Sequence, residues 1–279
     1  MKITDFHTHT FPDAIAERAI AGMQQNSHAK AFGTGTLTGL LDSMEQAGIA
    51  RSVILPVATN PLKIGSMNDK ILSQEKSQHI VNFGAMHPQA ENWKEELNRL
   101  AAAGVPGIKI HPQYQSTDIT DIHYLRILDH AASLGLITVT HAGDEIAYPG
   151  VVRCSPGMIR SVCDQLGNIP LVLAHMGGWK NWQRVAENLL DTGCYLDTAI
   201  SLGEIVPIDD HYSPADLPLL SGDNFVSLVR AFGSQRILFG TDSPWADQAE
   251  EIRKLRSLPL TPDELQNILS LNATRLLNI

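Results

Sequence analysis

The chain has little cysteine, with Cys154, Cys163 and Cys194 as its only three in 279 residues and no Cys-x-x-Cys pair. This count argues against a disulfide-stapled secreted scaffold and against a thiolate metal cluster. A chain of this length buries roughly three quarters of the surface that its unfolded form exposes, so it needs no covalent staples. We therefore expect a reducing compartment, and we expect any metal site to use nitrogen and oxygen ligands.

Positive charge is also scarce, because 21 Lys and Arg residues stand against 30 Asp and Glu residues for a formal net charge of −9. That balance argues against nucleic acid or an anionic membrane as the main partner. The apolar run Val53–Val57 is too short to span a bilayer, and the first ten residues carry Asp5, His7 and His9 where a targeting signal would be apolar. We expect a cytoplasmic protein with a small-molecule substrate. The prevalence of symmetric oligomers alone suggests a homodimer.

Short apolar runs alternate with amphipathic stretches along the whole chain. Most of the runs have four to seven β-branched or aliphatic residues, which is typical of parallel strands covered on both faces. The eight predicted strands are Lys2–Phe6, Ser52–Val57, Ile80–Met86, Gly107–His111, Ile137–His141, Pro170–His175, Cys194–Asp197 and Arg236–Asp242. Between them, apolar stripes such as Leu37, Leu40, Leu41 and Met44 predict helices, and glycines such as Gly48 close them.

This rhythm predicts an α/β fold, a (β/α)8 TIM barrel that forms one domain over residues 1–279. An open doubly wound sheet is the competing fold, but it usually has a glycine-rich turn after its first strand, and here that turn reads HTHTFP. Long loops are expected after the first, fifth and seventh strands, over Thr10–Thr36, Ala142–Cys154 and Ala199–Asn224. In a barrel all three lie at the C-terminal face, where active sites are built.

Histidine and aspartate gather at the predicted strand ends. His7 and His9 are two residues apart and point to one face of the first strand. The other strand-end residues are His111, His141, His175 and Asp242. Imidazole and carboxylate groups together suit Zn²⁺, Mn²⁺ or Fe²⁺. A single strand-end histidine is more often structural than a ligand, but the set as a whole predicts a metal site at the barrel mouth.

Lys109 lies inside an apolar run, where an unpaired lysine is costly. It has three interpretations: a salt bridge within the barrel mouth, a carboxylated lysine that bridges two metals, or a Schiff-base amine. Trp245 follows the eighth strand closely enough to line a pocket, and Arg153 is a candidate clamp for a substrate carboxylate.

Several motifs in this order resemble those of the amidohydrolase superfamily, specifically its amidohydrolase-related (amidohydrolase 2) group. They are DFHTHTFP, GIKIHP, HAG, LAHMGG, YLDT, LFGTDSPW and NATRLL, between residues 5 and 277. The resemblance implies a TIM barrel with a divalent metal at its mouth. By position it implies that His7, His9, His141 and Asp242 are metal ligands, with Asp242 also carrying a proton.

The resemblance further implies that His175 is catalytic, either polarising the substrate or assisting proton transfer. Lys109 stands where binuclear relatives place a carboxylated lysine, so Lys109 and His175 are candidate ligands of a second ion, although one ion is favoured. Zn²⁺ is the favoured metal, with Mn²⁺ or Fe²⁺ as alternatives. His111, Lys109, Trp245 and Arg153 are the predicted substrate contacts.

The group contains hydrolases, hydratases and non-oxidative decarboxylases. Its decarboxylases are usually longer than this chain, which favours hydrolysis of a small, carboxylated lactone, ester or amide by a metal-activated water. The alternative is a metal-dependent decarboxylase of an unsaturated or aromatic acid. A Schiff-base lyase that uses Lys109 and a non-catalytic binding barrel are the remaining hypotheses.

Overall fold

A computed structural model describes residues 1–75 and 77–279 of the chain. Its contacts divide the chain into two compact units. Unit 1 comprises Met1–Ile54 and Asp197–Ile279, and unit 2 comprises Leu55–Leu196. Among the described residues, no helix is both long enough and apolar enough to cross a membrane.

Unit 1 is built around β1, whose six residues are all buried. This strand runs parallel to β2, with Ile3 opposite Ile49 and Asp5 opposite Ser52. On its other side, the Phe6 amide donates to the carbonyl of Phe239, 2.7 Å away. The elements are β1 (Ile3–Thr8), α1 (Asp13–Ser27), α2 (Leu37–Ala47), β2 (Ile49–Ile54), η3 (Pro214–Asp216), α8 (Gly222–Phe232), η4 (Ser234–Arg236), β9 (Ile237–Leu238), α9 (Gln248–Ser257), α10 (Pro262–Gln266), η5 (Asn267–Leu271) and α11 (Asn272–Leu277).

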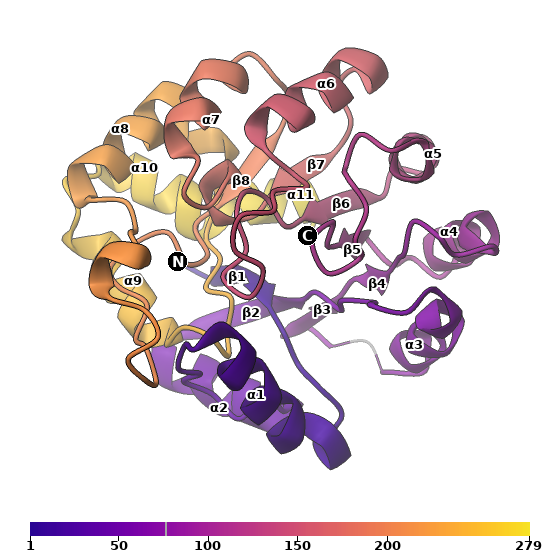
Figure 1. Ribbon diagram of the computed structural model, residues 1–279, viewed down its shortest axis with the longest axis horizontal. Coiled ribbons are helices and arrows are strands. Elements are labelled where there is room, and N and C mark those ends of the chain that lie inside the picture. Colours follow the sequence, from indigo (N-terminus) through magenta and orange to yellow (C-terminus); the bar gives the residue numbers. More distant parts are fainter. Residues whose placement is uncertain (76) are drawn as a thin grey trace. The chain divides into compact units, whose positions relative to one another are not determined.

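Unit 2 is a run of parallel strands with helices between them. Strands β4, β5, β6 and β7 pair in chain order, and β7 pairs with Tyr195 and Leu196 of β8. Helices α3 to α7 contact one another in the same order (Figure 1). The elements are η1 (Pro61–Lys63), α3 (Ile64–Leu72), β3 (Ile80–Asn82), β4 (Gly84–Ala85), α4 (Trp93–Ala102), β5 (Gly107–Ile110), α5 (Ile122–Ser133), β6 (Ile137–Thr140), α6 (Pro156–Leu166), β7 (Leu171–Leu173), η2 (His175–Gly177), α7 (Trp182–Asn188) and β8 (Tyr195–Asp197), whose last residue belongs to unit 1.

The helix ends follow the local sequence signals. Thr36 caps α2 by accepting a hydrogen bond from the Gly39 amide, and Gly48 ends the same helix in the left-handed region, at φ 69°. Thr261 forms a capping box with Glu264 at the start of α10. Gly48 lets the chain turn from α2 directly into β2.

Each of the eight predicted strands has a counterpart, although several bounds differ: β1 ends at Thr8 rather than Phe6, and β2 begins at Ile49 rather than Ser52. The predicted strand Ile80–Met86 is divided into β3 and β4, and beside β4 the Asn68 side chain bonds both the amide and the carbonyl of Ala85. The predicted loop Thr10–Thr36 is wrong in part, because it contains the fifteen-residue helix α1. The assignment of residues 1–279 to one domain stays a prediction.

Candidate metal centre

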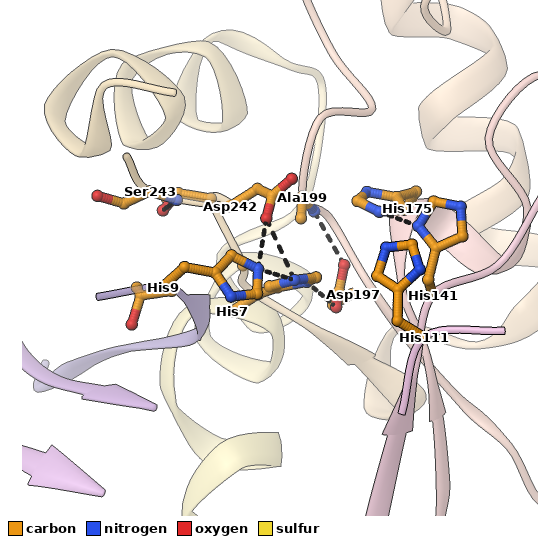
Figure 2. A network of polar contacts seen from close by, with 12 residues as sticks. His7, His9, His111, His141, His175, Asp197, Ala199, Asp242 and Ser243 are labelled. Atoms are coloured by element: carbon orange, nitrogen blue, oxygen red, sulfur yellow. Dashed lines mark hydrogen bonds and ion pairs between the residues drawn. The ribbon is translucent and has the colours of Figure 1, made fainter. Parts of the chain in front are cut away.

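Three side chains of unit 1 converge at the carboxyl end of β1 (Figure 2). The Nε2 atoms of His7 and His9 lie 3.1 Å apart. Asp242 Oδ1 lies 3.2 Å from His7 Nε2 and 3.0 Å from His9 Nε2. His7 is 1% exposed, whereas the His9 and Asp242 side chains are each 15% exposed.

Asp197 determines the protonation of His7. Its Oδ2 lies 2.8 Å from His7 Nδ1, and both side chains are buried. A carboxylate only accepts hydrogen bonds, so Nδ1 of His7 carries the proton. In the neutral imidazole, Nε2 then has a lone pair and no proton. That lone pair faces an oxygen of the Asp242 carboxylate.

Two acceptor atoms 3.2 Å apart repel each other unless a proton or a metal cation lies between them. Two imidazole nitrogens and one carboxylate oxygen are a ligand set that suits Zn²⁺, Mn²⁺ or Fe²⁺. The three residues therefore fit a divalent cation by both their chemistry and their mutual approach.

The backbone holds Asp242 in an uncommon conformation. Its φ is 65°, in the left-handed region, which aspartate tolerates better than most residues. The Asp242 amide donates to the His7 carbonyl at 2.8 Å, and the His9 amide donates to the Ser243 carbonyl at 2.7 Å. These two bonds fasten the end of β1 to the segment that carries Asp242. Backbone strain of this kind is concentrated at functional sites.

Gly240 leaves room for the first of these ligands. A β-carbon at this position would lie 2.9 Å from the His7 β-carbon and 3.3 Å from that of Asp197. Real β-carbons do not approach so closely, so any side chain at residue 240 would displace His7 or its partner.

Asp5 is buried beneath the group. Its Oδ2 accepts hydrogen bonds from Thr241 Oγ1 at 2.6 Å and from Gln248 Nε2 at 2.7 Å. Its Oδ1 accepts from the amides of His7 and Thr241, each at 3.1 Å. Burial raises the pKa of Asp5 to about 7, although these four bonds oppose the increase. Asp5 thus fastens the backbone of His7 to the segment that leads to Asp242.

Unit 2 carries a second polar group, formed by His111, His141, Glu145 and His175. Glu145 Oε2 lies 3.7 Å from both His111 Nε2 and His141 Nδ1. His175 Nε2 lies 3.1 Å from the same His141 Nδ1 (Figure 2). The His111 and His141 rings stack with centroids 4.3 Å apart. Within residues 1–75 and 77–279, two groups have ligand atoms close enough together to suit a metal ion: the His7 set, and His111 with His141 and Glu145.

Neighbouring groups fix the ring orientations in this second set. His141 Nε2 lies 3.0 Å from the Asp144 carbonyl oxygen, so Nε2 carries the proton and donates to it. The lone pair of His141 is therefore on Nδ1, which faces His175 and Glu145. His111 Nδ1 accepts from the Tyr114 amide at 3.3 Å, so its Nε2 carries the proton and faces Glu145. The Tyr114 ring also stacks on His111, with centroids 3.9 Å apart.

The buried side chain of Gln115 holds the backbone of His111 in place. Its Nε2 donates to the carbonyls of Ala58 and Met86, each at 2.7 Å. Its Oε1 accepts from the His111 amide at 3.0 Å and from the Tyr124 hydroxyl at 2.5 Å. All four hydrogen-bonding positions of this buried amide are therefore used.

The three remaining predicted site residues, Lys109, Arg153 and Trp245, differ in their burial and in their hydrogen-bond partners. Lys109 lies on β5, is 1% exposed and contributes a positive charge near the buried Cys154. Arg153 donates to Asp118 Oδ1 at 2.9 Å in a partly exposed ion pair. Trp245 is half-buried, and its amide donates to the Asp242 carbonyl. The structure thus groups His7 with His9 and Asp242, and it groups His111 with His141 and His175.

Two residues of these groups were not predicted. Asp197 ends the predicted seventh strand, so the strand-end rule that selected the histidines would also have selected it. Glu145 lies four residues after His141 in a loop, and that spacing is a weak signal in a non-helical segment.

Comparisons with known proteins agree on the fold. No curated protein matches the chain. A TIM-barrel protein from Bordetella bronchiseptica is 16% identical, with 100% of this chain and 99% of that chain covered and a TM-score of 0.74. A 5-carboxyvanillate decarboxylase from Novosphingobium aromaticivorans, solved with bound manganese, is 11% identical, with 100% and 97% covered and a TM-score of 0.71.

A third solved structure, from Pseudomonas putida, is provisionally named a 2-pyrone-4,6-dicarboxylic acid hydrolase. It is 16% identical, with 99% of this chain and 97% of that chain covered and a TM-score of 0.67. The predicted (β/α)8 TIM-barrel fold is confirmed by these similarities. The family model for Amidohydrolase matches residues 4–279, and the chain therefore belongs to the amidohydrolase 2 family, as its motifs predicted.

Proposed function

We propose that this protein is a divalent-metal-dependent hydrolase of a small, carboxylated lactone, ester or amide. The observation that carries the proposal is the convergence of His7 Nε2, His9 Nε2 and Asp242 Oδ1 within 3.0–3.2 Å of one another. Because Asp197 fixes the His7 tautomer, the lone pair of His7 Nε2 faces Asp242 Oδ1. Zn²⁺ is the favoured ion, with Mn²⁺ or Fe²⁺ as alternatives, and one ion is favoured over two.

A divalent ion, when bound, acidifies water from a pKa of about 15.7 toward about 7 and polarises a carbonyl group. His7 and His9 would hold the ion, and the family resemblance adds His141. Asp242 would also hold it and would accept the proton of the attacking water at its carboxylate, then deliver that proton to the leaving group. His175 would donate a hydrogen bond to the oxyanion that develops on the substrate.

The predicted substrate contacts carry suitable charge for an acid. Lys109 is a buried cation, and the His111 Nε2–H is a donor beside Glu145. Arg153 would bind a carboxylate by exchanging it for Asp118, its present partner. Trp245 would supply an apolar wall near Asp242.

Decarboxylation is the second candidate, and it is favoured by the 5-carboxyvanillate decarboxylase among the similar structures. Chain length no longer argues against it, since 97% of that decarboxylase is covered, the same share as for the protein named a hydrolase. In this reaction a protonated Asp242 or His175 would supply a proton to the carbon that loses carbon dioxide.

Metal analysis tests the metal-dependent chemistry that both candidates share. His7→Ala and His9→Ala variants should lose bound metal and all turnover. His123→Ala is the matched control, because His123 is a surface imidazole paired with Asp121 and should keep both. Full activity in metal-free protein would refute the metalloenzyme assignment, and borohydride trapping of substrate on Lys109 would favour the Schiff-base lyase.

A substrate screen separates the two reactions. 2-Pyrone-4,6-dicarboxylic acid and other carboxylated lactones, esters and amides should release acid without carbon dioxide if hydrolysis is correct. 5-Carboxyvanillate and related aromatic acids should release carbon dioxide if decarboxylation is correct. A metal-loaded protein that binds these acids but turns over none of them would indicate a binding barrel.

A further inference from the structure

Two of the three cysteines lie in contact in unit 2. The Sγ atoms of Cys163, on α6, and Cys194, just before β8, are 3.6 Å apart although 31 residues separate them in sequence. Neither cysteine forms a disulfide bond in the structure. The gap exceeds the length of a disulfide bond, about 2.05 Å, by roughly 1.6 Å.

The backbone on both sides of this pair is held in place. One turn before Cys163, the Arg160 guanidinium donates to Asp191 Oδ1 at 2.8 Å and to the Asn188 carbonyl at 3.4 Å. Next to Cys194, a β-carbon on Gly193 would lie 2.8 Å from the Asn168 side chain. The residues just before β8 therefore pack closely against the residues just after α6. The two thiols are therefore kept together by contacts that do not involve sulfur.

The two thiols differ in reactivity. Cys194 is 2% exposed, whereas Cys163 is half-buried and reachable by a small reagent. The hydrogen bond with Cys194 lowers the pKa of the Cys163 thiol, which favours its reactive thiolate. Cys154 provides a contrast, because burial raises the pKa of its thiol to about 12.

We propose that Cys163 and Cys194 are a modification site that takes a small-molecule disulfide as its reactant. The Cys163 thiolate attacks one sulfur of the reagent, forms a mixed disulfide and expels the first small thiolate. Cys194 loses its proton and attacks the Cys163 sulfur, which closes the protein disulfide and expels the second thiolate. The reagent is reduced to two thiols, which carry the two protons that the cysteines lose, and the protein is oxidised by two electrons.

Glutathione disulfide is the probe, and the whole folded protein is the target. After incubation, acid quenching and denaturation, free thiols should fall from three to one per chain, and a reducing dithiol should restore all three. A peptide map of the same sample should contain Cys163 linked to Cys194, and this readout needs no variant. Three remaining thiols, or a loss explained by links between chains, would overturn the proposal.

Single substitutions supply the matched controls. Cys154→Ser should go from two thiols to none, because it keeps the reactive pair. Cys163→Ser should keep its two thiols, because the half-buried, more accessible partner is gone. Equal thiol loss in wild type and Cys163→Ser, with both variants folded by circular dichroism, would contradict the pairing.

Discussion

The Asp197→Asn variant measures how much the Asp197 carboxylate, which orients His7, contributes to metal affinity. The Asp197 carboxylate accepts from His7 Nδ1 at 2.8 Å through Oδ2 and from the Ala199 amide at 3.1 Å through Oδ1. Asparagine has nearly the same shape but only one acceptor oxygen, so one of these two buried donors loses its partner. A hydrogen bond to a charged group contributes about 1.5–3 kcal/mol, which corresponds to roughly a 10- to 100-fold change in an equilibrium constant.

We expect Asp197→Asn to weaken binding of Zn²⁺ or Mn²⁺ by about 10- to 100-fold, the usual effect of removing a carboxylate behind a ligating histidine. Competition against a chromophoric chelator measures this affinity directly. Asp164→Asn removes the same charge from an exposed carboxylate paired with Arg160, and we expect its affinity to stay within about twofold of wild type. If Asp197→Asn also stays within twofold while folding normally, Asp197 does not orient a metal ligand and the tautomer argument is wrong.

Three further predictions concern the scaffold around the two groups. Gly240→Ala should displace His7, weaken metal binding by about tenfold and reduce the free energy of unfolding by about 1–3 kcal/mol, as measured by urea unfolding. Gly22→Ala is the control, because its new β-carbon has no neighbour within 4 Å, and it should leave the free energy of unfolding unchanged or raise it. Burial raises the pKa of Asp5 from 3.8 to about 7. The stabilisation by the protonated carboxyl, on the order of 4 kcal/mol, is therefore fully present below pH 4 and is lost as the pH rises through 7. Asp5→Asn should flatten this part of the profile of unfolding free energy against pH, and an unchanged slope would contradict the prediction. Gln115→Leu leaves the His111 amide and the Tyr124 hydroxyl without their acceptor and should cost about 3 kcal/mol in the same unfolding assay, with no loss if those bonds are unimportant.

The sequence predicted the strands and most of the first group because both depend on short-range patterns. Apolar runs of four to seven residues specify buried parallel strands, and His7 and His9 share a face through the strand repeat alone. The helix α1 was missed because its buried positions, such as Ala16 and Ile20, are few and its remaining residues are mostly polar or small. Its start also lacks a side-chain cap, since Pro12 stands at that position.

The side-chain pairings were beyond sequence reasoning. The bond between His7 and Asp197 joins residues 190 positions apart, and nothing local distinguishes Asp197 from other strand-end acids. Glu145 faces two histidines from a loop whose path depends on contacts such as Gly143 against Trp179. Such pairings follow from the packed backbone, which short sequence patterns do not describe.

The most direct test of the metal centre is anomalous X-ray scattering from crystals of the protein grown with Zn²⁺ or Mn²⁺. The account predicts a strong peak at the absorption edge of the added metal, in contact with His7 Nε2, His9 Nε2 and Asp242 Oδ1. Normal density for these three side chains with no peak among them, at a metal concentration that saturates the protein, would contradict it.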